Sequence, residues 1–147
     1  PDCYGIDMAK LGDLVAFPTA SQLAGTDPGA VAALGMPGAR ARTIVAIAGA
    51  VDAGDIDLRA GDPADVGESL ERLPGVGPWT SAYVRLRALG DPDVLPVTDL
   101  GIRHGARAAG LPEQPRALDE HARAWSPWRS YAAQHLWTPA PLTEETS

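Results

Sequence analysis

Residues 73–82 read LPGVGPWTSA, a stretch that sets Gly75 and Gly77 two positions apart, each beside a proline, directly before a helix-favouring segment. A Gly-x-Gly step between helices is typical of a turn that needs positive φ or the close approach of another group. Bare glycine backbone also lets the N–H groups of the turn and of the next helix N-terminus point at one anion. The stretch predicts a helix-hairpin-helix that binds phosphate. The alternative is a plain helix–turn–helix connection in which glycine only relieves crowding.

The rest of the chain carries helix signals and almost no strand signals. Asp27-Pro28 and Asp62-Pro63 each combine an N-cap residue with proline at the first helical position, and Ser126-Pro127 repeats the pattern. The expected helices cover about 28–35, 39–53, 63–73, 78–89, 99–109, 115–125 and 127–137. We therefore expect an all-α bundle of short helices at 17–138, with an irregular segment at 1–16 and a disordered tail at 139–147.

Length and composition suit one globular domain: the chain has 147 residues, of which 45% are hydrophobic and 21% charged. No window reaches the roughly 18 uninterrupted apolar residues of a membrane span, so we expect a cytoplasmic protein with no membrane partner. The single cysteine, Cys3, excludes an internal disulfide and an all-cysteine zinc or iron–sulfur site within this chain.

The net charge of −7 argues at first against a nucleic-acid partner, but the charge is unevenly distributed. Residues 72–137 hold eight Arg against six acidic residues, a balance of +2, while the remainder of the chain carries −9. This asymmetry permits phosphate binding without proving it, because Arg-rich helices are commonly just solvated faces.

The hairpin is followed by a loop with a glycine and two prolines and then by Asp99. This order of hairpin, loop and aspartate resembles the helix-hairpin-helix (HhH-GPD) DNA glycosylases, most closely the branch of DNA-3-methyladenine glycosylase II. The matching segments are Leu73–Tyr83, Val97–Arg103, Trp125–Trp137 (WSPWRSYAAQHLW), Phe17-Pro18-Thr19 and Leu34-Gly35-Met36. The resemblance covers residues 15–138 and implies a nucleoid-associated repair enzyme whose partner is double-stranded DNA containing alkylated bases.

By this resemblance Asp99 is the catalytic carboxylate. Breaking the C1′–N bond of a flipped nucleotide leaves an oxocarbenium-like sugar, which a nearby negative charge stabilises. Asp99 would either stabilise that cation or activate water, and the sequence leaves both open. The alternative is a helix N-terminal aspartate that only complements the macrodipole. Lyase-competent relatives have a lysine before the counterpart of Thr80; this chain has Trp79 there and its only lysine is Lys10, which implies a monofunctional glycosylase.

The resemblance assigns the base pocket to Trp79, Tyr83 and Trp137, whose ring faces suit a positively charged alkylated purine. Trp79 and Tyr83 are four residues apart and share a helix face, whereas Trp137 points away from Trp128 on its own helix. The resemblance places Trp125 and Trp128 in the core; the alternative puts all four tryptophans there. Arg103, His104 and Arg129 are candidate contacts to the DNA backbone or solvated charges.

The family pattern assigns phosphate binding to the turn and the start of the next helix. The residues concerned are Gly75, Val76, Gly77 and Thr80. The resemblance implies no organic cofactor, no iron–sulfur cluster and no metal held by side chains, but it allows a structural Na⁺ or K⁺ at the carbonyls of Leu73 and Val76.

The start of the chain departs from the family. Its members have further helices before the counterpart of Phe17, including the one that wedges into the gap left by the flipped base, and residues 1–16 contain no copy of it. We expect an N-terminally truncated domain that is feeble or inactive on its own. The parent protein could also carry a fused upstream domain. The alternative hypotheses are a non-catalytic helix-hairpin-helix DNA-binding module, an inactive fragment of such an enzyme, and an acidic helical interaction domain.

Overall fold

The computed structural model describes residues 17–138, which contain only helices and loops. In chain order the elements are α1 (Ala20–Ala24), α2 (Pro28–Ala32), α3 (Gly38–Asp52), α4 (Pro63–Glu71), α5 (Pro78–Ala88), α6 (Leu100–Ala108), α7 (Pro115–Ala122), the 3₁₀ turn η2 (Arg123–Trp125) and α8 (Arg129–Trp137). None of the helices in this part of the chain is long and apolar enough to cross a membrane. The expected all-α fold is confirmed, while the segments 1–16 and 139–147 lie outside the described residues.

The Asp-Pro pairs begin helices as predicted. Asp27 caps α2 by accepting the Ala30 N–H at 3.2 Å, and Asp62 caps α4 by accepting the Ala64 N–H at 2.9 Å, each with proline at the first helical position. The short helix α1 was not expected. Its signal was available, because Thr19 and Gln22 form a capping box with the Thr-x-x-Gln spacing.

The last helix begins two residues later than predicted. Pro127 precedes α8 in a cis Ser126–Pro127 peptide, and Trp128 rather than Ser126 is the N-cap. Ser126 does not cap a helix, because the amides that such a cap would accept bond elsewhere: the Trp128 N–H donates to the Trp125 carbonyl at 2.8 Å, and the Arg129 N–H donates to Asp93 Oδ1 at 3.2 Å. The Ser126 hydroxyl itself donates to the Asp93 carboxylate at 2.8 Å. The expected helix 115–125 is divided into α7 and η2.

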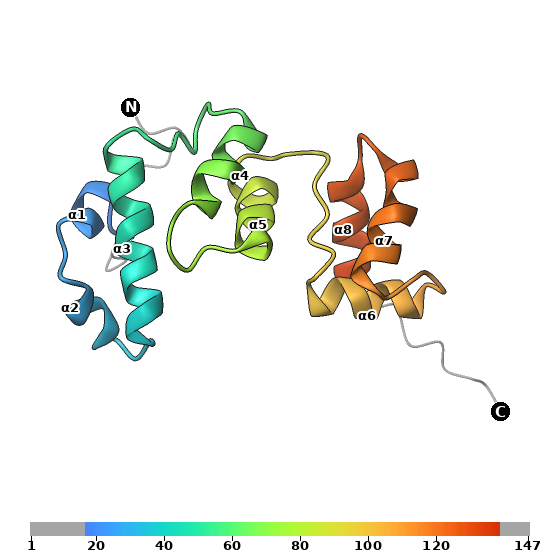
Figure 1. Cartoon of the computed structure of the whole chain (residues 1–147), viewed down its shortest axis with the longest axis horizontal. Coiled ribbons are helices and arrows are strands. Elements are labelled where there is room, and N and C mark those ends of the chain that lie inside the picture. Colours follow the sequence, from blue (N-terminus) through green and yellow to red (C-terminus); the bar gives the residue numbers. More distant parts are fainter. Residues whose placement is uncertain (1–16, 139–147) are drawn as a thin grey trace, which may run out of the picture.

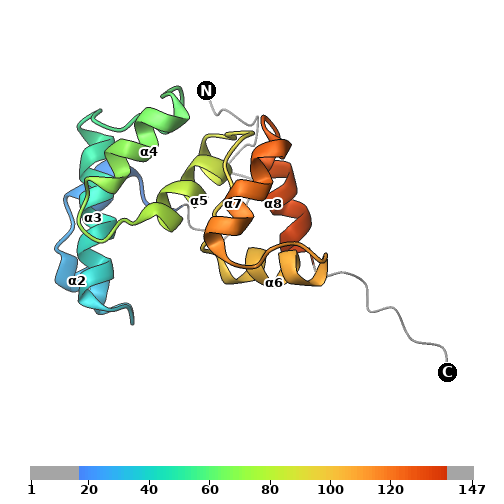
Figure 2. The same cartoon turned by 45° about the vertical axis from the view of Figure 1, so that its right-hand side comes forward.

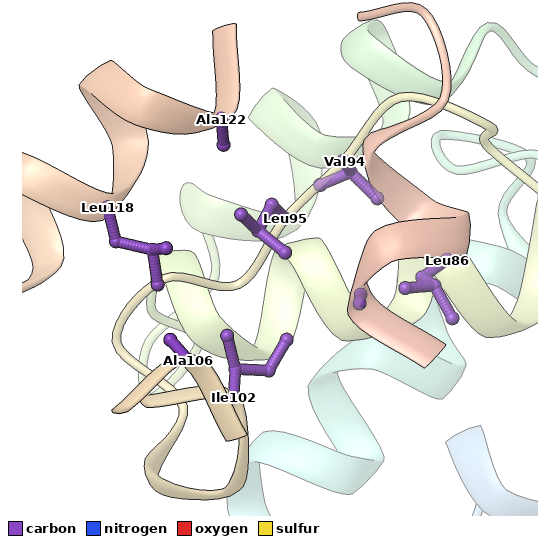
Figure 3. Close-up of a cluster of buried hydrophobic side chains, with 8 residues drawn as sticks. Leu86, Val94, Leu95, Ile102, Ala106, Leu118 and Ala122 are labelled. Atoms are coloured by element: carbon purple, nitrogen blue, oxygen red, sulfur yellow. The ribbon is translucent and has the colours of Figure 1, made fainter. Parts of the chain in front are cut away.

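Two hydrophobic cores flank α5. One joins α3, α4 and the hairpin, and consists of Ile56, Val66, Leu70 and Val76. The other joins α5 to α6, α7 and α8; Figure 3 shows Leu86, Val94, Leu95, Ile102, Ala106, Leu118 and Ala122 of this cluster. Helix α5 packs into both, and Figures 1 and 2 show it between α3–α4 on one side and α6–α8 on the other.

The hairpin is fixed to α3 by its first glycine. Gly75 has φ +87°, which favours glycine, and an added Cβ would overlap the Thr43 side chain. Thr43 Oγ1 donates to the Pro74 carbonyl at 2.9 Å. The two hairpin helices cross closely at small residues, since the buried Ser81 hydroxyl donates to the Gly67 carbonyl at 3.2 Å. The turn is therefore held by both chain conformation and packing.

The loop between α5 and α6 is held by two arginines from different helices. Arg85 of α5 donates to the Asp91 carboxylate at 2.9 and 2.6 Å. Arg129 of α8 donates through Nε to Asp93 Oδ1 at 2.7 Å, and the buried Ser130 hydroxyl donates to the Asp91 carbonyl at 2.6 Å. These bonds fix the loop that leads to Asp99.

Helices α6 and α8 approach closely because α6 has glycine at the contact. An added Cβ at Gly105 would overlap the Leu136 backbone, so we expect Gly105→Ala to destabilise the fold by about 1–3 kcal/mol. The matched control is Gly49→Ala in α3, where an added Cβ meets no atom of residues 17–138 within 4 Å; it should stabilise by about 0.5–1 kcal/mol through helix propensity. Urea unfolding followed by circular dichroism measures both, and a Gly105→Ala variant as stable as the parent would contradict the α6–α8 contact.

The Asp93–Arg129 pair predicts a loss of stability in acid. The hydrogen bond from Arg129 is the main reason that the pKa of Asp93 falls from 3.8 to about 2. Ionised Asp93, bound by Arg129 and Ser126, therefore stabilises the fold fully above pH 3.8, by roughly 2 kcal/mol, and this contribution is lost as the pH falls from about 4 to about 2.

Asp93→Asn should accordingly lower the free energy of unfolding at pH 7, and its difference from the parent should shrink toward pH 2. Urea midpoints at a series of pH values measure this. Glu68→Gln is the control, because its pair with Arg72 is exposed and should contribute little. A difference between Asp93→Asn and the parent that is constant with pH would rule out the proposed cause.

Candidate active site

Asp99 lies where the loop meets α6 and is contacted from three helices. It is the N-cap of α6, and its Oδ1 accepts the Ile102 N–H at 3.0 Å. The indole Nε1–H of Trp137, at the end of α8, donates to the same oxygen at 2.8 Å. The indole Nε1–H of Trp79, in the first turn of α5, donates to Oδ2 at 2.7 Å. The carboxylate is therefore a helix cap, as the simpler alternative held, and also the junction of two tryptophans.

Opposing influences set the pKa of Asp99. Burial is the largest, and it raises the pKa because the ionised form loses hydration. The Ile102 amide, the indoles of Trp137 and Trp79 and the Gly101 amide oppose it by donating to the ionised form. Their combined effect holds the pKa below its usual 3.8, so Asp99 is ionised at neutral pH.

Trp79, Tyr83 and Trp137 form one aromatic cluster beside Asp99. Trp79 and Tyr83 are stacked, with 5.4 Å between ring centroids and 18° between planes. Tyr83 meets Trp137 edge-on at 6.1 Å. Trp79 is 43% exposed and Tyr83 38% exposed, so the cluster presents ring surface to solvent. The structure thus brings together the three residues that the sequence assigned to the base pocket.

The other two tryptophans differ from each other. Trp125 is partly buried and packs against the core of α6–α8, as expected. The prediction that Trp128 packs in the core is wrong, because its side chain is 58% exposed. The cause is the late start of α8: as N-cap, with φ −120° and ψ 23°, Trp128 lies outside the helix, and its ring meets that of exposed Tyr131 at 5.6 Å.

Two residues next to the cluster were not anticipated from the sequence. An added Cβ at Gly101 would lie 2.9 Å from Trp137 Cδ1, so glycine here gives the indole room to reach Asp99. Arg87 places its guanidinium carbon 5.8 Å from the Tyr83 ring centroid and 5.6 Å from that of Trp137. The signal for Arg87 was its position four residues after Tyr83, on the same helix face.

The hairpin presents free amides at the start of α5, the end that carries Trp79. Within residues 17–138 no side chain caps this helix, and the N–H groups of Gly75, Gly77 and Thr80 have no acceptor. Val76 differs: its N–H donates to the Leu73 carbonyl at 3.1 Å, and its side chain is buried.

Gly77 has no internal reason to be glycine. Its φ of −113° is open to any residue, and an added Cβ would meet nothing within 4 Å among the described residues. The position therefore leaves bare backbone at a helix N-terminus, where the macrodipole favours an anion.

Two of the three basic candidates have internal partners. Arg129 is bound to Asp93, and Arg103 Nε donates to the Glu113 carbonyl at 3.1 Å. Both therefore contribute to the structure of the domain, a role that the sequence did not suggest for them. The side chain of His104 is exposed.

Two cavities lined by described residues lie away from Asp99. One lies between the loop and α8, beside Asp91 and Tyr131, and the other is beside Val51 and Ile56. At Asp99 itself the two indoles occupy the space next to the carboxylate. A ligand that reaches Asp99 has to contact or displace these rings.

Residues 7–130 match the family model of the HhH-GPD superfamily of base excision DNA repair proteins. The chain is 50% identical over 123 residues to the probable bifunctional transcriptional activator/DNA repair enzyme AlkA of Mycobacterium tuberculosis. This match covers 83% of the present chain and 24% of the relative. It is 36% identical over 135 residues to DNA-3-methyladenine glycosylase 2 of Escherichia coli, which covers 91% of this chain and 46% of that protein. The chain thus spans less than half the length of these relatives.

Solved structures agree with this match. The 3-methyladenine DNA glycosylase Mag1 of Schizosaccharomyces pombe, in complex with abasic DNA, superposes with a TM-score of 0.71 at 29% identity, over 82% of this chain and 62% of that one. DNA-3-methyladenine glycosidase from Bacillus halodurans gives a TM-score of 0.68 at 28% identity, over 83% and 59%. The fold expected from the sequence, that of the helix-hairpin-helix glycosylases, is confirmed.

Replacing Trp137 by Phe tests the electrostatics of Asp99. Trp137→Phe removes one N–H donor but keeps an aromatic ring. We expect the pKa of Asp99 to rise, because one of the hydrogen bonds that counteract the effect of burial is lost. A carbon NMR titration of the Asp99 carboxyl measures the change. Trp128→Phe, at an exposed tryptophan, should leave this pKa unchanged. An unchanged pKa in Trp137→Phe would mean that the indole does not bind the carboxylate in solution.

Proposed function

Because the chain belongs to the HhH-GPD superfamily of base excision DNA repair proteins, we propose that it carries the catalytic core of a monofunctional DNA glycosylase. The reaction is hydrolysis of the N-glycosidic bond of alkylated purines of the 3-methyladenine type, after the nucleotide flips out of double-stranded DNA. The observation that carries the proposal is an ionised Asp99 bound by two indoles. One of these indoles, that of Trp79, lies in the first turn of the helix that follows the hairpin and its free amides.

In this proposal Asp99 stabilises the sugar cation rather than activating water. A carboxylate whose pKa is lowered is a weak base, and each oxygen of Asp99 already accepts an indole N–H. Its negative charge would still stabilise the positive charge that develops at C1′, because the carboxylate is partly buried and little screened by water. The geometry therefore favours one of the two roles that the sequence left open.

The hairpin is proposed to bind a DNA phosphate. The amides of Gly75, Gly77 and Thr80 would donate to it, because none of them has an acceptor within residues 17–138. Val76, also predicted as a phosphate ligand, would instead support the turn through its buried side chain and its internal hydrogen bond. Such contacts read no sequence, and their small number predicts a modest salt dependence of binding.

The aromatic cluster is proposed to receive the damaged base. Ring faces bind flat cations by stacking and cation–π attraction, and an alkylated purine is such a cation. A strand-cleaving glycosylase would need an amine to attack C1′, and position 79 offers an indole that is already bound to Asp99. The product in this proposal is an abasic site.

A structural Na⁺ or K⁺ at the hairpin carbonyls also belongs to the proposal. The Val76 carbonyl accepts no hydrogen bond within residues 17–138, and the Leu73 carbonyl accepts one, from the Val76 N–H. Each oxygen thus keeps a lone pair for a cation, which would brace the turn without taking part in the chemistry. The proposal includes no organic cofactor, iron–sulfur cluster or side-chain metal site.

Asp99→Asn tests the proposed chemistry. Asparagine caps a helix about as well as aspartate, so the fold should survive, while the loss of charge should slow base release at least about 100-fold. Release of 3-methyladenine from methylated duplex is measured with protein in excess, so that a slow reaction remains visible. Binding to a duplex with an abasic site should persist.

The matched control is Asp62→Asn, because Asp62 caps α4 as Asp99 caps α6. It should leave base release unchanged. If the parent chain, and a chimera that supplies the preceding segment of the Escherichia coli relative, bind abasic DNA but release no base, the domain is a DNA-binding module and the catalytic proposal is wrong.

A further inference from the structure

Arg87 extends the aromatic cluster into a ladder of three side chains along α5. Trp79, Tyr83 and Arg87 follow one another at four-residue intervals and so share a helix face. Tyr83 stacks on Trp79 toward the N-terminus of the helix, and the Arg87 guanidinium carbon lies 5.8 Å from the Tyr83 centroid toward the C-terminus. The same carbon lies 5.6 Å from the centroid of Trp137.

The charge of Arg87 has no carboxylate partner in the part of the chain that the structure describes. Arg85, two residues earlier, differs in this respect, because it binds Asp91 and serves the loop. A guanidinium stays charged under all ordinary conditions. A permanent positive charge therefore already rests on two of the three rings of the cluster.

We propose that Arg87 is a specificity-determining residue, which sets how strongly the aromatic cluster prefers positively charged bases over neutral ones. This inference rests on the proposed function, because it concerns the same base-binding site. A ring face that already attracts one cation is less available to a second, and two cations at this range repel each other. A neutral base stacks without that repulsion. Arg87 thus weakens the binding of cationic bases relative to neutral ones, so that the site accepts a broader range of bases.

The test compares a cationic and a neutral flat ligand that share one bicyclic ring system and differ by an N-methyl group. The 147-residue chain is titrated with N-methylquinolinium, which is permanently positive, and with quinoline, which is neutral at pH 7. Binding is followed through the indole N–H signals of Trp79 and Trp137 in proton–nitrogen NMR spectra. Both signals report on the cluster, because each indole N–H is bonded to Asp99.

Arg87→Gln should bind N-methylquinolinium about two- to fivefold more tightly than the parent, the range that one exposed cation–π contact supports, and quinoline equally well. Arg87→Lys keeps the charge and should behave like the parent. Arg116→Gln removes the same charge from an exposed position paired with Glu120 on α7. It should leave both affinities unchanged, which separates a local effect from one of net charge.

The proposal is overturned if Arg87→Gln gains equally for both ligands, if it binds the cation no better than the parent, or if neither protein binds the cation. The titration requires no base release. A chain that releases no base from alkylated DNA but shows the cation-specific gain would remove the proposed function and leave the effect of Arg87 on ring binding in place.

Discussion

Hydrogen bonds from two indole N–H groups to one carboxylate link α5 and α8 to the start of α6. Trp79 comes from the hairpin helix, Trp137 from the last helix, and Asp99 from the start of a third. A partly buried carboxylate is stable only where donors replace its lost hydration, and three elements supply them here. The site exists because these helix ends converge, and each of them is held in place by other residues.

Those supports are small residues and loop ion pairs. Gly101 gives the Trp137 indole room, and Gly105 lets α8 approach α6 backbone to backbone. Arg85 of α5 and Arg129 of α8 fix the loop before Asp99 through Asp91 and Asp93. None of these residues touches a ligand in the proposed reaction. They determine whether the carboxylate and the rings meet at all.

Much of this was predictable where the signal is local. Proline at a helix start and glycine in a turn act within a few residues, so the hairpin and most helix starts follow from the sequence. Packing across the chain is not local. The exposure of Trp128 accompanies the late start of α8, where the Ser126 hydroxyl and the Arg129 amide both donate to Asp93, and no local sequence pattern indicates such distant bonds. The bonds from two tryptophans to Asp99 and the position of Arg87 on the rings likewise emerge only in three dimensions.

Helix α5 begins directly after the bare glycine amides of the hairpin and carries, two residues after Gly77, the indole that binds Asp99. The distance between an anion bound at the N-terminus of α5 and the Asp99 carboxylate would therefore be set within a single helix, and not by a hinge between domains. If the proposed contacts form, the DNA phosphate bound at the hairpin and the sugar that faces Asp99 would stand at a constant spacing along the strand. The choice of base would then fall to the rings and to the Arg87 guanidinium that lies over two of them.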